Sequence, residues 1–340
     1  MRVTLLDQEN EDHWTRFVQA HGFLGYTFNL SWRDSLSEIG IGEPIYWLIF
    51  DNDVVIGILP TFLRKSPFGN IVSSLPYSQS EGGLRLIPSL TPSVRKMALD
   101  ALIAELRGFI DEHDVALWIE VGSAFTEDRP LLFKESSFFE LDRQICANNL
   151  DMKLEFDNER IKANLRKAER SKLVLFSGHD EGSKKRIYDV YYHAMSTIRV
   201  SPHSWEFFSN LSEDMVRFDG VIMGGEIVAA VILIQGGGVV NYYASGGTKE
   251  GRNAGATTWL CRILIERAKL EGNRWWKWMA SPSKGVYEFK KGWGGEDRKY
   301  RITGWRFGEL DALLDLSPQD LSRHFSSHFV LPFELLDSSR

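Results

Sequence analysis

The sequence predicts an α/β protein made of two similar units. Its 340 residues exceed the usual size of one hydrophobic core, so two domains are expected. The two halves also repeat the same order of helices and strands. The stretch DNDVVIGILP at 51–60 matches MGGEIVAAVI at 223–232 in pattern and spacing, which indicates an internal duplication. We therefore expect one domain at residues 1–150 and a second at 151–340.

The first half alternates helical and strand-like patterns. Residues 45–50 and 54–64 predict two strands, because the polar stretch 51–53 between them is typical of a hairpin turn. Apolar residues at helical spacing predict a long helix at 94–112. The other predicted elements are a helix at 14–19, a strand at 71–77, a turn at 82–83 and a strand at 115–121.

The second half gives the same order again. A hairpin is predicted at its centre, where the turn 224–225 separates the strand-like stretches 215–222 and 227–235. The remaining predicted elements are helices at 184–197 and 254–271 and strands at 239–244 and 274–279. The last strand carries three tryptophans, which indicate either large aromatics on both faces of a half-buried strand or a base-stacking platform.

A basic stretch at 157–173 joins the two halves on a helix-forming background. Its cations are Arg160, Lys162, Arg166, Lys167, Arg170 and Lys172. The stretch is either the solvated face of a linking helix or a docking surface for phosphates of an acceptor or of a tRNA. On the second interpretation Arg166 binds the acceptor.

Composition excludes several classes of protein. A net charge of -6 argues against a basic groove over the whole surface, and we expect no DNA partner. Cys146 and Cys261 lie far apart without paired metal spacing, so no metal site is expected and a reducing compartment fits. No apolar run approaches the length of a membrane span, and the first residues lack a long apolar segment. The expected location is the cytoplasm.

The segment from Arg252 to Gly294 has the parts that acyl transfer needs. A glycine-containing turn, formed by Arg252, Gly255, Ala256 and Thr257, leads into a predicted helix. A helix start offers unpaired N–H groups and the positive end of the helix dipole, so an anionic donor can bind there. Lys290 adds a fixed cation, which can stabilise the negative charge that builds on a carbonyl oxygen during acyl transfer.

Several motifs together resemble the FemAB-like proteins, a branch of the GNAT superfamily. In the second half they are NLRKAERSKL at 164–173, DGVIMGGEIVAAVILI at 219–234 and GVYEFKKGWGG at 285–295. In the first half they are NLSWRDSL at 29–36, the long stretch at 54–77 and SEGGL at 80–84. The resemblance covers about residues 10 to 305. It implies two tandem GNAT-like domains, of the acyl-CoA N-acyltransferase fold, with mixed, mostly antiparallel central sheets flanked by helices.

The resemblance also implies a function. Members of known activity are aminoacyl-tRNA-dependent transferases that build peptidoglycan bridges, and many relatives are described as N-acyltransferases. We therefore expect an N-acyltransferase without a tightly bound cofactor. It would move an acyl or aminoacyl group from acyl-CoA or aminoacyl-tRNA to an amine acceptor, such as a cell-envelope or peptide precursor. The alternative is a non-catalytic FemAB-like protein that recognises an envelope precursor or a protein partner.

Residue roles follow from the same resemblance. The family places the lysine of its Phe-Lys pair near the reacting carbonyl, and that position is Lys290 here. Superfamily enzymes often use a tyrosine as the acid that protonates the leaving group, and Tyr287 is the candidate, with a packed aromatic as the alternative. In the donor loop, Arg252, Gly255 and Thr257 take the three marked places, although a small residue is usual at the third.

Acceptor binding is expected in a cleft between the two domains. Relatives place an arginine for acceptor phosphate after the helix that corresponds to residues 188–198, where this chain has Arg199. Tyr242 and Tyr243 alternate on a strand, so one should face the core and the other the substrate. The lysine that contacts phosphate in muramyl-peptide-binding members is replaced by Leu36, and Arg33 is the candidate substitute.

Overall fold

The computed structural model describes residues 1–22, 24–77, 81–125, 132–133, 136–153, 158–279 and 284–337. The chain divides into two compact units: the first holds residues 1–21, 27–144 and 299–340, and the second holds residues 22–26 and 145–298. The chain enters the second unit inside β7 (Phe139–Asn149) and leaves it inside β13 (Glu296–Arg306). This division departs from a boundary at residue 150, because residues 302–306 of β13 pair with β6 (Val115–Val121) in the first unit.

The sheet of the first unit has the order β1-β2-β3-β4-β6-β13, and β5 also pairs with β3. Its neighbours are antiparallel except for β4 and β6, which are parallel. The other elements of this unit are β1 (Arg2–Leu5), α1 (Glu11–Ala20), α2 (Leu30–Glu38), β2 (Glu43–Asp51), β3 (Val54–Arg64), β4 (Asn70–Ser73), β5 (Arg85–Leu86), α3 (Pro92–Glu112), α10 (Asp311–Leu314), α11 (Pro318–His324) and α12 (Glu334–Asp337).

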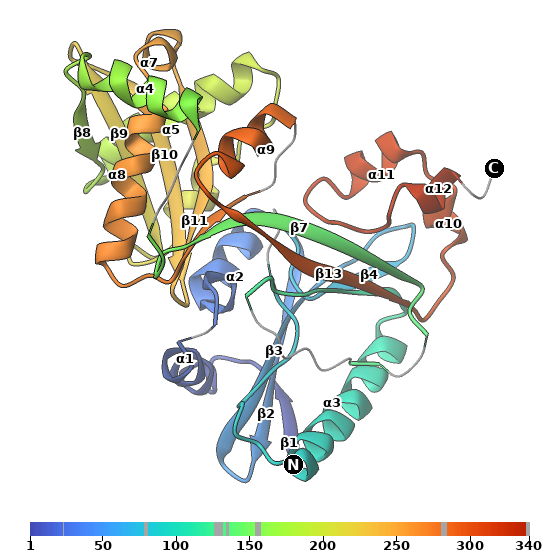
Figure 1. Ribbon diagram of the computed structural model, residues 1–340. Helices are drawn as coiled ribbons and strands as arrows, with labels where there is room; N and C mark the ends of the chain where they lie inside the picture. Colours follow the sequence, from blue (N-terminus) through green and yellow to red (C-terminus); the bar gives the residue numbers. More distant parts are fainter. Residues whose placement is uncertain are drawn as a thin grey trace. The chain divides into compact units, whose positions relative to one another are not determined.

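Helices cover both faces of this first sheet. Tyr46 on β2 contacts Trp14 of α1, and the next residue, Trp47, contacts Phe109 of α3. Since consecutive strand residues point to opposite faces, α1 and α3 lie on opposite sides of the sheet. Figure 1 shows α3 along one side of β1, β2 and β3. The predicted hairpin and both predicted helices are present, whereas α2, capped by the Asn29 side chain, was not predicted.

The sheet of the second unit has the order β7-β12-β11-β10-β9-β8. Its neighbours are antiparallel except for β11 and β12, which are parallel. The elements are α4 (Glu159–Glu169), β8 (Val174–Ser177), α5 (Glu181–Thr197), α6 (Trp205–Ser209), β9 (Val216–Met223), β10 (Glu226–Gly236), β11 (Val239–Gly247), α7 (Lys249–Asn253), α8 (Ala256–Leu270), β12 (Trp275–Trp278) and α9 (Lys284–Lys291).

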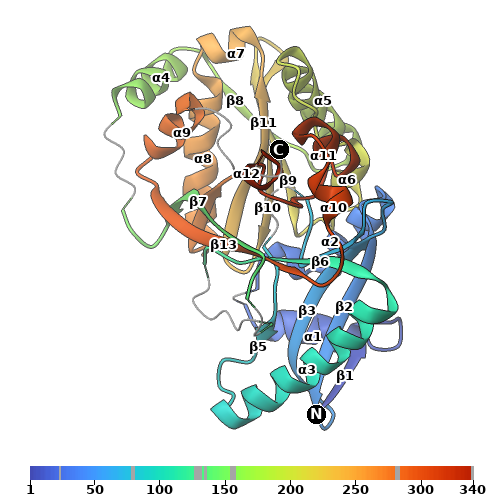
Figure 2. The same ribbon diagram turned by 90° about the vertical axis from the view of Figure 1, so that its right-hand side faces the viewer.

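Helices α5 and α8 cover opposite faces of the second sheet, as Figure 2 shows. A side chain on Gly246 would meet Ala194 of α5, and one on Gly247 would touch Thr257 of α8. Gly246 and Gly247 are consecutive residues of β11, so a Cβ on each would point to the opposite face of the sheet. The predicted α/β class, with mixed, mostly antiparallel sheets flanked by helices, is confirmed.

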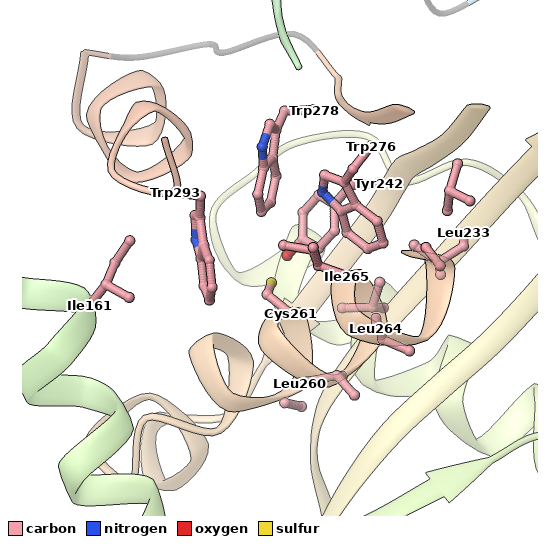
Figure 3. Packing of buried hydrophobic residues seen from close by; sticks show 14 of the residues in the cluster. Ile161, Leu233, Tyr242, Leu260, Cys261, Leu264, Ile265, Trp276, Trp278 and Trp293 are labelled. Atoms are coloured by element: carbon pink, nitrogen blue, oxygen red, sulfur yellow. The ribbon is translucent and has the colours of Figure 1, made fainter. Parts of the chain in front are cut away.

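Tryptophans fill the core between the second sheet and α8 (Figure 3). Trp276 and Trp278 on β12 are fully buried, and their ring centroids lie 5.6 Å apart. Trp275 is also buried, but the Arg298 guanidinium lies over its ring, 4.4 Å from the centroid. The tryptophan strand is thus a packed strand with aromatics on both faces, and its rings are not open for stacking on bases.

Candidate active site

The turn before α8 has a shape that only glycine fits. Gly255 has a φ of +74°, in the left-handed region. A Cβ at this residue would lie 2.3 Å from the carbonyl oxygen of Asn164 on α4. Just upstream, the Arg252 guanidinium donates to the carbonyl of Gly247 at 2.6 Å, which closes the turn onto the end of β11. The candidate donor loop is therefore a tight, locally bonded turn.

The first turn of α8 has free backbone donors. Gly255 precedes the helix and has no side chain to cap it. In the part of the chain that the structure describes, the amides of Ala256, Thr257 and Thr258 have no hydrogen-bond partner. Such amides, together with the helix dipole, favour an anion. The local geometry thus agrees with an anion site at 256–258, and its use by a donor stays a prediction.

Strands β11 and β12 separate beside this turn. They pair from Val239 opposite Trp275 to Tyr242 opposite Trp278, although β11 continues to Gly247. The register between β10 and β11 shifts at Tyr243, which makes this residue the extra one of a bulge. Among the described residues, no strand pairs with the other edge of β11 at 243–247. A Cβ on Gly247 would lie 3.4 Å from the Thr257 hydroxyl, so this open edge ends at the first turn of α8.

Lys290 is buried where the two strands separate. Its side chain is 5% exposed, and its Nζ donates to the carbonyl of Met279, the residue directly after β12. Burial lowers the pKa of this lysine from 10.5 to about 8. Phe289 and Trp293 pack against Trp278, with ring centroids 6.0 and 6.1 Å away. The sequence predicted a lysine that projects from a pinned segment; the segment is pinned, but the ammonium points inward.

Asn148 is a site residue that the sequence analysis missed. It is 3% exposed on β7, and its Nδ2 donates to the Trp293 carbonyl at 2.8 Å. Its Oδ1 accepts from the Trp278 indole N–H at 2.7 Å. The only signal in the sequence is an amide side chain in a stretch otherwise suited to a buried strand. Two residues earlier, burial raises the pKa of the Cys146 thiol to about 11, so this cysteine remains a thiol.

Tyr287 lies on α9 beside a carboxylate. Its hydroxyl is within hydrogen-bond distance of both carboxylate oxygens of Asp297, at 3.0 and 2.8 Å. This hydrogen bond raises the pKa of the tyrosine, since it favours the protonated phenol. Lys291 forms an ion pair with the same carboxylate at 3.4 Å. The assignment of Tyr287 as the acid stays a prediction, with a pKa shift that makes it a weaker acid.

Tyr242 and Tyr243 face opposite sides of the sheet, as expected, and both are buried. Tyr242 lies against Trp278, 5.0 Å between centroids, and its hydroxyl forms a hydrogen bond with Cys261 of α8 (Figure 3). Tyr243 lies on the side of α5 and α6, 5.1 Å from the His203 ring. Burial lowers the pKa of His203 to about 4, so its ring is neutral at pH 7. Tyr242 thus faces the core, and substrate contact at Tyr243 stays a prediction.

The two candidate arginines lie on exposed surfaces. Arg199 follows α5 with a φ of +57°, and no ion pair to it occurs among the described residues. Arg166 is on α4, where it pairs with Glu159 at 3.8 Å. Helix α4 packs its buried residues Ile161 and Leu165 into the core of the second unit and leaves its basic face in solvent. Residue 157, where this helix was expected to begin, lies outside the described residues.

The first unit has two positions of interest for phosphate binding, Leu36 and Arg33, and neither presents an unpaired positive charge. Leu36 is fully buried. The Arg33 guanidinium pairs with Glu11 at 2.7 Å and with Asp34 at 2.6 Å. A phosphate contact by Arg33 stays a prediction, and its guanidinium already pairs with two carboxylates.

Two further properties concern metal and membrane. Over the described ranges, no group of three or more His, Cys, Asp or Glu side chains could hold a metal ion. Within the same ranges, no helix has both the length and the apolar character needed to cross a bilayer.

Comparisons with known proteins show which domain and which solved structures this chain is similar to. The model of the acetyltransferase (GNAT) domain matches residues 158–291, which run from the start of α4 to the end of α9. No curated protein matches the chain in sequence. The structure is similar to that of FemX, with a TM-score of 0.69 and 12% identity, over 93% of this chain and 99% of that one.

Two other solved structures have the same fold. L-PGS from Bacillus licheniformis gives a TM-score of 0.57 at 13% identity, over 95% of this chain and 98% of that one. A tandem GNAT protein from the clavulanic acid biosynthesis pathway gives a TM-score of 0.51 at 11% identity, over 91% and 99%. At such low identities these likenesses show a shared fold of two GNAT-like units. Residues 158–291 therefore match a GNAT acetyltransferase domain, and the whole chain has the fold of two GNAT-like units.

Proposed function

We propose that the protein is an N-acyltransferase that takes its acyl group from acyl-CoA and passes it to an amine. The observation that carries this proposal is the separation of β11 from β12 between the first turn of α8 and Lys290. CoA has a pyrophosphate and an extended arm with two amide groups. The pyrophosphate would bind the amides of 256–258, and the arm would pair with the open edge of β11 at 243–247.

The open edge of β11 at 243–247 would lead the donor from the amides of 256–258 to Lys290. Five strand residues span about 16 Å, since each adds about 3.3 Å. At the far end, Trp278 pairs with Tyr242, and Met279 next to it accepts the hydrogen bond from Lys290. A donor laid along β11 would thus bring its thioester to the ammonium.

The chemical step needs no covalent enzyme intermediate. The acceptor amine attacks the thioester carbonyl, the C–S bond breaks as the amide bond forms, and the proton lost by nitrogen ends on the CoA thiol. Negative charge builds on the carbonyl oxygen, and the Lys290 ammonium would stabilise it. We assign no general base, because Asp219 is buried and already bonded to Ser177 and Arg267, and Glu226 and Glu288 are exposed.

The donor can be identified by thermal unfolding. CoA at about 100 times its Kd should add about 2.7 kcal/mol to the free energy of unfolding and raise Tm. Arg252→Ala, which removes the side chain that closes the donor turn, should weaken this effect. Arg262→Ala is the matched control, because Arg262 is exposed later on α8 and, among the described residues, forms an ion pair with Glu266 alone, at 3.0 Å.

The same measurement separates the alternatives. Protection by charged tRNA that falls steeply with salt, without protection by CoA, would contradict the CoA donor and favour aminoacyl transfer. Binding of CoA without turnover across a panel of amines would instead support a non-catalytic protein.

The rate of transfer should depend on pH through Lys290. With the acceptor saturating, kcat should fall as pH rises through about 8, because the ammonium then loses its proton. Lys290→Arg should not show this decline, since guanidinium stays protonated. Dividing the wild-type rate by the Lys290→Arg rate at each pH removes the contribution of the acceptor amine. A ratio that is constant with pH would contradict the charge role.

A further inference from the structure

Asn148 joins two segments that hold Lys290. Its Oδ1 accepts from the Trp278 indole at the end of β12, and its Nδ2 donates to the carbonyl of Trp293, just after α9. Lys290 on α9 closes the ring, because its Nζ donates to Met279, which follows Trp278. Three contacts therefore link β7, β12 and α9 around the ammonium.

This amide lies on an apolar face of the sheet. Asn148 is opposite Trp276, and Cys146, Trp276 and Trp278 belong to the same buried hydrophobic cluster. A polar side chain among such neighbours costs free energy unless it is hydrogen-bonded, and an apolar residue would fill the position more simply. Both polar atoms of Asn148 are bonded, at 2.7 and 2.8 Å. Its geometry therefore suits a fixed connection between two segments.

The segment after α9 has little freedom of its own to move. A Cβ on Gly295 would lie 2.4 Å from Cys146 Sγ and 3.4 Å from Asn148 Oδ1, so the chain crosses directly over these two side chains. A Cβ on Gly292 would lie 2.7 Å from the Asn158 amide at the start of α4. Trp293 lies between these two glycines. Its carbonyl accepts the hydrogen bond from the Asn148 side chain, which connects β7 to the end of α9.

We propose that Asn148 is a positioning residue that sets where α9 places the Lys290 ammonium, by tying the Trp278 indole to the carbonyl of Trp293. Its bearing on catalysis rests on the proposed function, whereas its effect on Lys290 does not. Without Asn148, the end of α9 would lose its side-chain hydrogen bond to β7, and water would reach the ammonium more readily.

The test follows Lys290 itself by NMR, so that no substrate is needed. In protein labelled with ¹³C at lysine Cε, the Lys290 signal is the one that Lys290→Arg removes. Its titration in wild type should give a pKa of about 8. Asn148→Ala should move this value towards that of an ordinary lysine, because the buried ammonium becomes better hydrated.

Asn241→Ala is the matched control. Asn241 is also a buried asparagine, 1% exposed, on β11, which lies beyond β12 in the same sheet, and its Nδ2 donates to the Ile234 carbonyl at 2.9 Å. Its loss should disturb the sheet to a similar degree and leave the Lys290 titration unchanged. Trp278→Phe removes the indole N–H while keeping an aromatic ring at this position, and it provides the test if Asn148→Ala fails to fold.

The outcomes separate the two proposals. An equal Lys290 titration in wild type, Asn148→Ala and Trp278→Phe would overturn the positioning role, whatever the activity. A shifted titration supports it. The rate of transfer from acyl-CoA to an amine is then measured at a pH below the wild-type Lys290 transition. If the titration shifts but this kcat stays at the wild-type value, the catalytic role of Lys290 is wrong, whereas Asn148 still positions it. If kcat falls and the donor KM does not change, both proposals stand.

Discussion

Lys290→Met is expected to lower kcat/KM for acyl transfer by roughly 100-fold to 1,000-fold, the usual cost of removing one donor from a developing oxyanion. Methionine keeps the unbranched shape of the side chain and removes the charge. Because burial lowers the pKa of this lysine, its charged form is disfavoured in the folded protein. The variant should therefore unfold at a Tm no lower than that of wild type, and steady-state kinetics with acyl-CoA will measure the loss.

The neighbouring lysine supplies the control. Lys291 has a partly exposed side chain and pairs with Asp297 at 3.4 Å. Lys291→Met removes the same charge from the same helix, and such a pair contributes little to stability. It should keep kcat/KM close to wild type. Equal losses in the two variants would show that α9 as a whole, rather than the buried ammonium, matters for the rate.

Gly255→Ala is expected to reduce the free energy of unfolding by more than 2 kcal/mol. The left-handed φ of +74° alone costs an alanine about 1 to 2 kcal/mol. In addition, the new Cβ would lie 2.3 Å from the Asn164 carbonyl oxygen, so α4 and α8 must move apart. The affinity for CoA should fall with stability, since the amides at 256–258 shift with the turn. Urea unfolding and CoA titration measure the two effects.

Gly272→Ala is the matched control at the other end of α8. Gly272 has a φ of +82°, but no atom lies within 4 Å of the position a Cβ would take. It should therefore show the backbone cost alone and leave CoA binding unchanged. If Gly255→Ala and Gly272→Ala reduce the free energy of unfolding equally, the close approach of Asn164 on α4 to Gly255 has no effect on stability.

Much of the fold could be predicted because its signals are local. The hairpins β2–β3 and β9–β10 follow from turn residues between alternating strands, and their register is fixed over a few residues. The helix starting after Gly255 could be predicted from its glycine turn. These elements need no knowledge of distant parts of the chain.

The parts that sequence could not predict depend on contacts between distant residues. Asn148 meets Trp293, 145 residues away, so its role is not visible in its neighbours. The inward direction of Lys290 depends on the Met279 carbonyl, and Arg33 could not be known to pair with Glu11. Sequence identified which residue types were available, but folding decided which of them remained accessible.

The insertion of the second unit between β7 and β13 reverses the usual order of events during synthesis. Domains generally fold as units, beginning with the part that leaves the ribosome first. Here β6 lacks its neighbour β13 until residues 302–306 have been made, after all of the second unit. The second unit can therefore begin to fold while the first unit still lacks its last strand, and the unpaired edge of β6 would need protection in the nascent chain.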